Sequence, residues 1–137
     1  MSASAVQLKK LWWAGPLTVL AAILGVLIVR TIARAILPSP YAPGLEMIML
    51  PVMLTLILCT GAVIVYALVG RFAKNPVRTY VIISAIFLVI SFLPDIAVVS
   101  APFPGAGWAY SITLMIMHVV AGFTTVYSLI KFTTANT

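Results

Sequence analysis

Hydrophobic residues fill four long runs of this chain, and charged residues are confined to the short segments between the runs and to the two ends. Runs of about 20 apolar residues match the hydrocarbon thickness of a membrane, where a helix satisfies its own backbone hydrogen bonds. A transmembrane β-barrel would instead alternate apolar and polar residues over segments of about ten. The sequence therefore predicts an all-α integral membrane protein. The four runs are residues 11–29, 47–69, 79–93 and 109–130.

Proline and glycine indicate where the helices end. Three prolines within 38–43 stop the first helix, and a second Pro/Gly segment at 101–107 separates the last two. Gly70 is expected to close the second helix as its C′ residue. The third helix meets Pro94, where we expect a break before it resumes. The predicted helices cover about 11–37, 45–69, 76–100 and 108–132.

Short connections favour an antiparallel arrangement of neighbouring helices, so we expect an up-down-up-down four-helix bundle. The helices and their connections use nearly the whole chain, and 64% of its residues are hydrophobic against 7% charged. No room is left for a soluble domain, so we predict a single transmembrane domain over residues 1–137.

The basic residues are sorted unevenly between the two sides of the predicted bundle. Arg30 and Arg34 share one side with the only two acids, Glu46 and Asp95. The other side holds the six remaining bases, which are Lys9, Lys10, Arg71, Lys74, Arg78 and Lys131. By the positive-inside rule, both termini are expected in the cytoplasm. Because these bases flank apolar spans and form no basic stripe, we expect no nucleic-acid binding despite the net charge of +6.

Ionisable side chains inside hydrocarbon are costly, at about 2.5–3.5 kcal/mol on insertion scales, and so mark candidate sites. Arg30 and Arg34 are four residues apart and share one helix face. Arg34 is close enough to the helix end to extend to the headgroups, whereas Arg30 lies about 6 Å deeper. Either both arginines contact outer headgroups, or one of them pairs with Asp95 across helices 11–37 and 76–100.

The two acids have structural interpretations beside functional ones. Asp95 follows Pro94, where it could cap the broken helix, pair with an arginine or bind a proton on a conduction path. Glu46 is expected in the first turn of the helix over 45–69, where the helix dipole favours an anion.

His118 lies near mid-membrane, eleven residues beyond the 101–107 segment, on a face that also carries Ser111 and Gly122. It either bonds as a neutral imidazole to a neighbouring hydroxyl or carbonyl, or acts as an axial ligand to a haem or a chlorophyll-type pigment. Its axial offset from Asp95 is about 10 Å by helix rise, so a proton relay between the two would need a bridging water.

Motifs of catalysis and metal binding are missing from the sequence. It has one histidine and one cysteine, so neither a metal-ligand spacing nor an intrachain disulfide is available. Cys59 lies mid-span and is interpreted as a small buried apolar residue. The first apolar run is too long for the core of a cleaved signal peptide and is interpreted as a retained helix. We therefore lean toward a non-enzymatic protein without a metal site.

Two short motifs accompany the four spans: Leu93-Pro94-Asp95 late in the third and Met117-His118-Val119-Val120 in the fourth. With them, the chain resembles a family of small bacterial membrane proteins that is known only as a domain of unknown function. The resemblance implies a location in the bacterial cytoplasmic membrane and matches Asp95 and His118 to the family's polar positions. It implies no activity, and it does not account for Arg30.

Three functions are compatible with these features. The first is a packing or accessory module of a membrane complex or homo-oligomer, in which buried polar groups hold helices in register. The second is a cofactor- or pigment-binding subunit that uses His118. The third is a small proton or solute conductor that uses Asp95 with Arg30.

Overall fold

The computed structural model describes residues 6–134, and all regular secondary structure in that range is helical apart from an isolated bridge between Val6 and Thr134. Four of its helical segments are long and apolar enough to cross a membrane. The elements in chain order are η1 (Leu8–Lys10), α1 (Leu11–Ile36), α2 (Pro43–Glu46), α3 (Met49–Phe72), α4 (Pro76–Ala97), η2 (Val98–Ser100) and α5 (Trp108–Thr133). The prediction of an all-helical fold with four helices suited to cross a membrane is therefore confirmed.

The second predicted helix, over 45–69, differs from the structure at both ends. Its start is interrupted, because Met47 adopts an extended conformation between α2 and α3. Its end lies beyond Gly70, which is inside α3 and is not a C′ residue. The reason is tertiary: a Cβ on Gly70 would come within 2.9 Å of the Leu8 side chain. Gly70 thus permits the close approach of η1.

Pro94 does not interrupt the helix in which it lies. α4 runs through it to Ala97 and continues as η2 to Ser100, so helical structure covers the predicted 76–100 without the expected break. Proline within a membrane helix is tolerated where neighbouring groups satisfy the carbonyl that loses its N–H donor.

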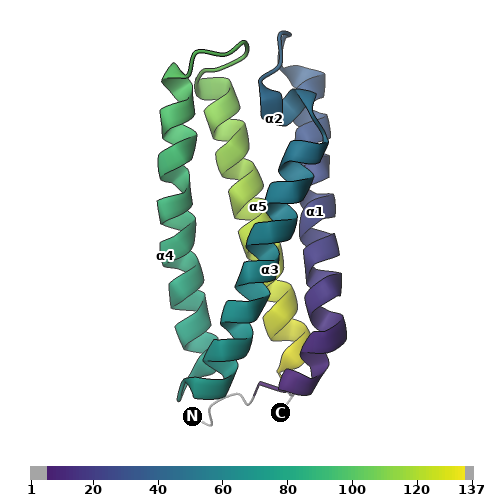
Figure 1. Ribbon diagram of the computed structural model, residues 1–137, viewed down its shortest axis with the longest axis vertical. Helices are drawn as coiled ribbons and strands as arrows, with labels where there is room; N and C mark the ends of the chain where they lie inside the picture. The colour runs from purple at the N-terminus through teal and green to yellow at the C-terminus, as the bar shows by residue number, and fades with distance from the viewer. Residues whose placement is uncertain (1–5, 135–137) are drawn as a thin grey trace.

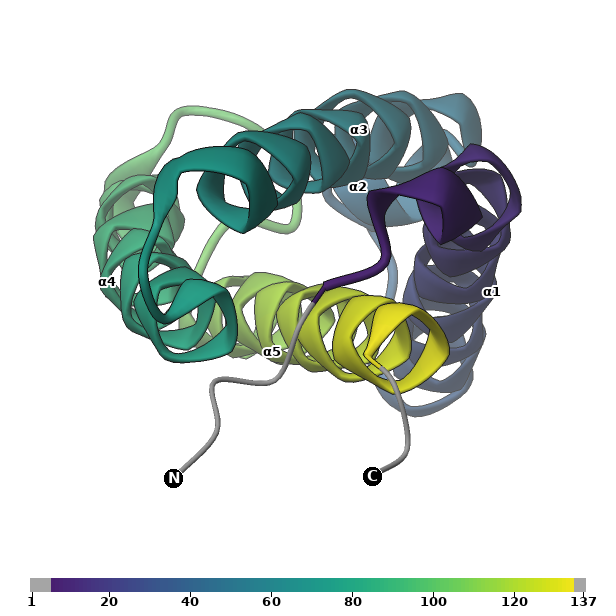
Figure 2. The same cartoon turned by 90° about the horizontal axis from the view of Figure 1, so that it is seen from below.

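The four long helices lie side by side with α1 and α4 at opposite corners (Figures 1 and 2). α1 packs against α3 and α5, and α4 packs against the same two helices from the other side. α3 crosses the bundle obliquely, so that it lies next to α4 at one end and next to α1 at the other. We name the two ends of the bundle by what they carry. At the terminal end, Gln7 N donates to Thr133 O at 2.8 Å. The loop end carries segments 37–48 and 101–107.

The interior consists of three small clusters of apolar residues. The first, at the loop end, joins α1, α2 and α5 and includes Val26, Leu45 and Met117. The second lies around Ala22 and Cys59. The third, at the terminal end, is built on Tyr66, Tyr80 and Leu129, with the two tyrosine rings 4.7 Å apart.

The helices are embedded in the bundle to very different degrees. In the most apolar window of each span, 28% of residues are buried for the span containing α1, but only 6% for the span containing α4. Most of the α4 surface therefore consists of exposed apolar side chains such as Ile86 and Phe87. Such a surface is stable in lipid, where exposed hydrocarbon costs nothing, and unstable in water.

At the loop end, the two connecting segments contact each other closely. Gly105 has a φ of +78°, and a Cβ on it would lie 2.6 Å from the Pro40 carbonyl oxygen. Gly44 N donates to the Tyr110 hydroxyl at 3.0 Å, which ties α2 to the start of α5. Glycine is needed at both places, at Gly105 for its backbone conformation and at Gly44 because the Tyr110 hydroxyl occupies the space of a side chain.

Candidate functional site

A hydrogen bond between α4 and α5 joins two of the residues that the sequence marked as candidates. Asp95 Oδ2 lies 2.7 Å from His118 Nδ1. This is the only ion-pair geometry among residues 6–134, and it becomes a charge pair when the imidazole is protonated. The distance is typical of a charge-assisted hydrogen bond. The structure thus joins an acid and a base directly, inside a span.

The offset of about 10 Å along the bundle axis led us to expect no direct contact between the two residues, and that expectation was wrong. Each side chain leaves its helix toward the N-terminus of that helix. The N-terminus of α5 is at the loop end and that of α4 is at the terminal end, so His118 and Asp95 lean toward each other along the bundle axis (Figure 1). A direct hydrogen bond takes the place of the bridging water that we predicted from the sequence.

The two members of the pair differ in burial. The Asp95 side chain is 5% exposed and the His118 side chain is 30% exposed. Within the part of the chain that the structure describes, the Asp95 carboxylate has no other hydrogen-bond partner, so it does not cap the helix beside Pro94. The imidazole therefore lies between the buried carboxylate and the outer surface of the bundle.

Arg30 lies in the interior but does not pair with Asp95. It is 7% exposed, and its Nη2 donates to the carbonyl oxygen of Glu46 at 3.1 Å, which ties α1 to the end of α2. The hypothesis of an arginine–Asp95 pair fails because α1 and α4 occupy opposite corners of the bundle. Among the described residues no group accepts from Arg30 Nε, although that atom is buried.

Arg34 and Glu46 are at the margin of the bundle. The Arg34 guanidinium lies over the Tyr41 ring, 4.9 Å from its centroid, and the Tyr41 hydroxyl donates to the Arg34 carbonyl at 2.9 Å. Glu46 ends the short helix α2, and its side chain is exposed. The predicted place of Glu46 in the first turn of a long helix was wrong, because the chain breaks at Met47.

Further buried polar groups follow α5 from the loop end to the terminal end. Ser111 is fully buried, and its hydroxyl has no partner within residues 6–134. Thr125 Oγ1 lies 3.4 Å from Cys59 Sγ, and the Tyr66 hydroxyl lies 2.6 Å from Thr133 Oγ1. Ser111, His118 and Thr125 are spaced by seven residues, and this heptad spacing is the sequence signal for a common face.

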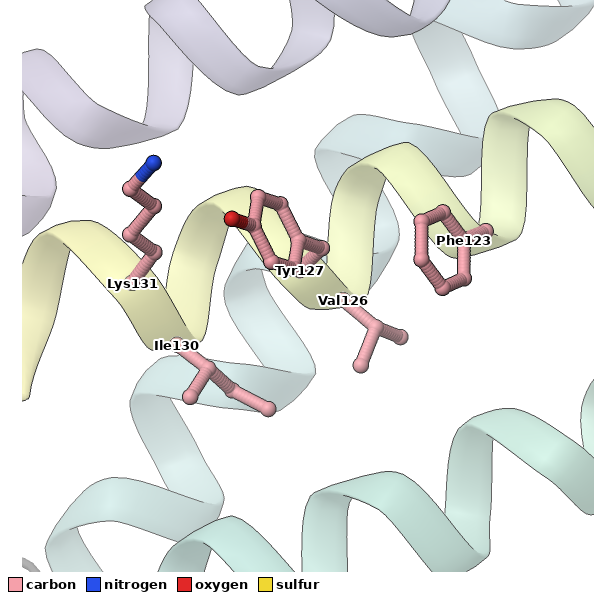
Figure 3. A pocket seen from close by; sticks show the side chains of 5 residues that line it. All are labelled: Phe123, Val126, Tyr127, Ile130 and Lys131. Carbon is pink, nitrogen blue, oxygen red and sulfur yellow. The ribbon is translucent and has the colours of Figure 1, made fainter.

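Two shallow hollows lie away from the Asp95–His118 pair. One, of about 250 Å³, lies between segments 37–45 and 105–110 at the loop end. The other, of about 350 Å³, lies along α5 from Phe123 to Lys131 (Figure 3). Neither of these two hollows is lined by Asp95 or His118.

The chemistry open to the pair follows from its two groups. A carboxylate and an imidazole at hydrogen-bond distance can exchange a proton between them. Asp95 occupies Nδ1, so Nε2 is the nitrogen left for a ligand, and a carboxylate on the other nitrogen is the usual way to orient a ligating histidine. Within the described residues no cluster of three His, Cys, Asp or Glu side chains could hold a metal ion.

The chain belongs to a family of unknown function, DUF6069, whose sequence model matches residues 6–134. The resemblance to an uncharacterised family is thereby confirmed over nearly the whole chain. No protein of curated function matches the chain, and no solved structure does. The function must therefore be inferred from the site itself.

Proposed function

We propose that this protein crosses the bacterial cytoplasmic membrane as a single antiparallel four-helix domain, with both termini in the cytoplasm. Six basic residues and no acid lie toward the terminal end, while both acids lie toward the loop end. The Gln7–Thr133 hydrogen bond supports a common side for the two termini. Reporter tags on the two ends should both respond from the cytoplasm, and signals from opposite compartments would refute this topology.

We propose further that the protein is a small proton conductor, or a proton-coupled solute conductor, with the Asp95–His118 pair as its proton-binding site. The observation that carries this proposal is the 2.7 Å contact between a buried carboxylate and a partly exposed imidazole within membrane spans. Ionisable groups at such depth are expensive and characteristically serve as proton relays. Arg30 contributes a second buried charge from α1, without touching the pair.

The depths of the two residues suit transfer between the loop end and the middle of the membrane. Asp95 is five residues from the end of η2, about 9 Å by helix rise, and His118 is ten residues into α5, about 15 Å. A proton received by the carboxylate from the loop end would pass to the imidazole near mid-membrane.

Proton flux into proteoliposomes tests this function. Under an imposed potential, the wild-type protein should carry protons, and Asp95→Asn and His118→Gln should each reduce the flux by at least about a hundredfold, the lower end of the range for loss of one proton-transfer group. Ser100→Ala is the matched control, because its hydroxyl contacts only the Ala97 carbonyl, at 3.5 Å, near the same end of α4. Equal flux for the wild type and the Asp95→Asn variant would refute conduction by this pair.

A packing or accessory module is the second candidate, and the sparse burial of α4 favours it. With 6% of the apolar window of its span buried, α4 offers the surface that does not face α3 and α5 to a second copy or to another membrane subunit. Cross-linking in the membrane should then capture α4 against a partner. A strictly monomeric species in mild detergent, with no copurifying protein, would contradict it.

A pigment-binding role is favoured by one feature, the orientation of His118 by Asp95. The purified protein should then absorb in the visible range, and His118→Ala should abolish that absorbance while Ser111→Ala leaves it intact. A preparation without visible absorbance removes this alternative.

A further inference from the structure

The hollow along α5 combines an apolar groove with one cation (Figure 3). It has a volume of about 350 Å³ and is lined by Phe123, Val126, Tyr127, Ile130 and Lys131. Apart from the lysine amine and the tyrosine hydroxyl, its lining is hydrocarbon. The groove therefore suits a long apolar ligand with a negative charge at one end.

Two aromatic rings and the lysine define the shape of this groove. The rings of Phe123 and Tyr127 are stacked, with centroids 5.9 Å apart and planes 9° apart. They are 70% and 53% exposed, so they form a wall on the outside of the bundle. The Lys131 amine lies 5.3 Å from the centre of the Tyr127 ring, and no carboxylate pairs with it within residues 6–134.

The length of the groove matches one leaflet of a membrane. Phe123 and Lys131 are eight residues apart, which corresponds to about 12 Å along a helix. The hydrocarbon of a single leaflet is about 15 Å thick, half of a 30 Å core. Lys131 is in the last turn of α5, so the charged end of the groove is at the terminal end and the apolar end points to mid-membrane.

The charge around the terminal end selects a negative headgroup. Lys9 and Lys10 lie in η1, which packs against α5, and the remaining bases on this side are Arg71, Lys74 and Arg78. Both acids of the described chain lie toward the other end. Clusters of basic residues at the membrane surface attract anionic lipids.

We propose that this groove binds one anionic phospholipid, with its phosphate on Lys131 and an acyl chain along Phe123 and Tyr127. The occupant is a lipid because the groove runs within a membrane span and has the length of one leaflet. The site is separate from the Asp95–His118 pair, so it stands independently of the conduction proposal.

Native mass spectrometry of the protein from mixed micelles of phosphatidylglycerol and phosphatidylcholine tests this site. The wild type should retain phosphatidylglycerol preferentially, and Lys131→Gln should weaken that retention about fivefold, the factor expected for one base beside an anionic lipid. Lys74→Gln is the matched control, because it removes the same charge from an exposed position at the same end. It should lower retention by much less than Lys131→Gln does, because Lys74 does not line the groove.

A second variant distinguishes lipid binding in the groove from general attraction of anionic lipids to the basic surface. Phe123→Ala combined with Tyr127→Ala should reduce lipid retention while leaving all six bases in place, and circular dichroism should show an intact helical fold. Equal losses in Lys131→Gln and Lys74→Gln would overturn the proposal in favour of diffuse attraction. Absence of any preference for phosphatidylglycerol in the wild type, or full retention in the aromatic variant, would overturn it as well.

Discussion

Removing either partner of the Asp95–His118 pair should destabilise the bundle, but by different amounts. His118→Leu leaves a carboxylate that is 5% exposed and cannot be hydrated, so it must take up a proton or remain as an uncompensated charge. Asp95→Leu leaves an imidazole that is 30% exposed, and burying a neutral polar group costs less than burying a charge. Loss of the histidine should therefore cost more than loss of the aspartate.

The magnitudes follow from the burial of each orphaned group. An unsatisfied buried polar group costs about 1–3 kcal/mol, so we expect about 2 kcal/mol for His118→Leu and about 1 kcal/mol for Asp95→Leu. The double variant removes both polar groups and should cost only about 1.5 kcal/mol. The resulting coupling of about 1.5 kcal/mol lies near the upper limit of about 1.7 kcal/mol for hydrogen bonds between membrane helices. The short distance and low exposure of the carboxylate justify a value at that limit.

Reversible unfolding in mixed micelles of mild detergent and dodecyl sulfate, followed by circular dichroism, gives the four free energies of the cycle. Asp95→Asn is the control, because its amide oxygen can still accept from Nδ1 and its volume is unchanged. It should recover most of the loss seen with Asp95→Leu. Single variants that add within about 0.5 kcal/mol, or an aspartate change that costs more than the histidine change, would refute this account of the pair.

Two further substitutions test other parts of the structure in the same unfolding assay. Arg30→Leu should change the free energy of unfolding by less than about 1 kcal/mol, because it removes an unpartnered Nε together with one bond to the Glu46 carbonyl; a loss above about 2 kcal/mol would mean that the guanidinium has a stronger partner. Gly105→Ala should cost about 1–3 kcal/mol and exceed Gly107→Ala, since both have positive φ but only Gly105 meets the backbone at Pro40. Equal costs would show that the contact between the two loop-end segments adds no stability.

The four spans were predictable because their signal is local. A long apolar run bounded by Pro, Gly or charged residues identifies a membrane helix without knowledge of its neighbours. The starts of α1, α4 and α5 at residues 11, 76 and 108 coincide with the predicted ones. The errors came where tertiary contacts decide, as at Gly70, which looked like a helix terminator and instead makes room for Leu8.

The residues of the candidate site could be predicted from the sequence, but which of them form a pair could not. Asp95, His118 and Arg30 could be identified because ionisable groups within apolar runs are rare. Their partners depend on which helices are neighbours and on the direction in which each side chain leaves its helix. Sequence spacing gives depth in the membrane, but it does not show that α1 lies opposite α4. The assignment of an arginine to Asp95 failed for that reason.

The weak embedding of α4 gives the Asp95–His118 pair a mechanical role as well. Among the described residues, this is the one side-chain hydrogen bond that joins α4 to another helix, and the Tyr66–Tyr80 ring contact supports α4 only at the terminal end. Lipid replaces much of the apolar contact between helices at little cost, so a polar contact decides where such a helix stays. The loop-end half of α4 is thus held to α5 by a bond whose strength depends on its protons. Proton binding at this pair and displacement of α4 should therefore be coupled, each shifting the other by the same free energy.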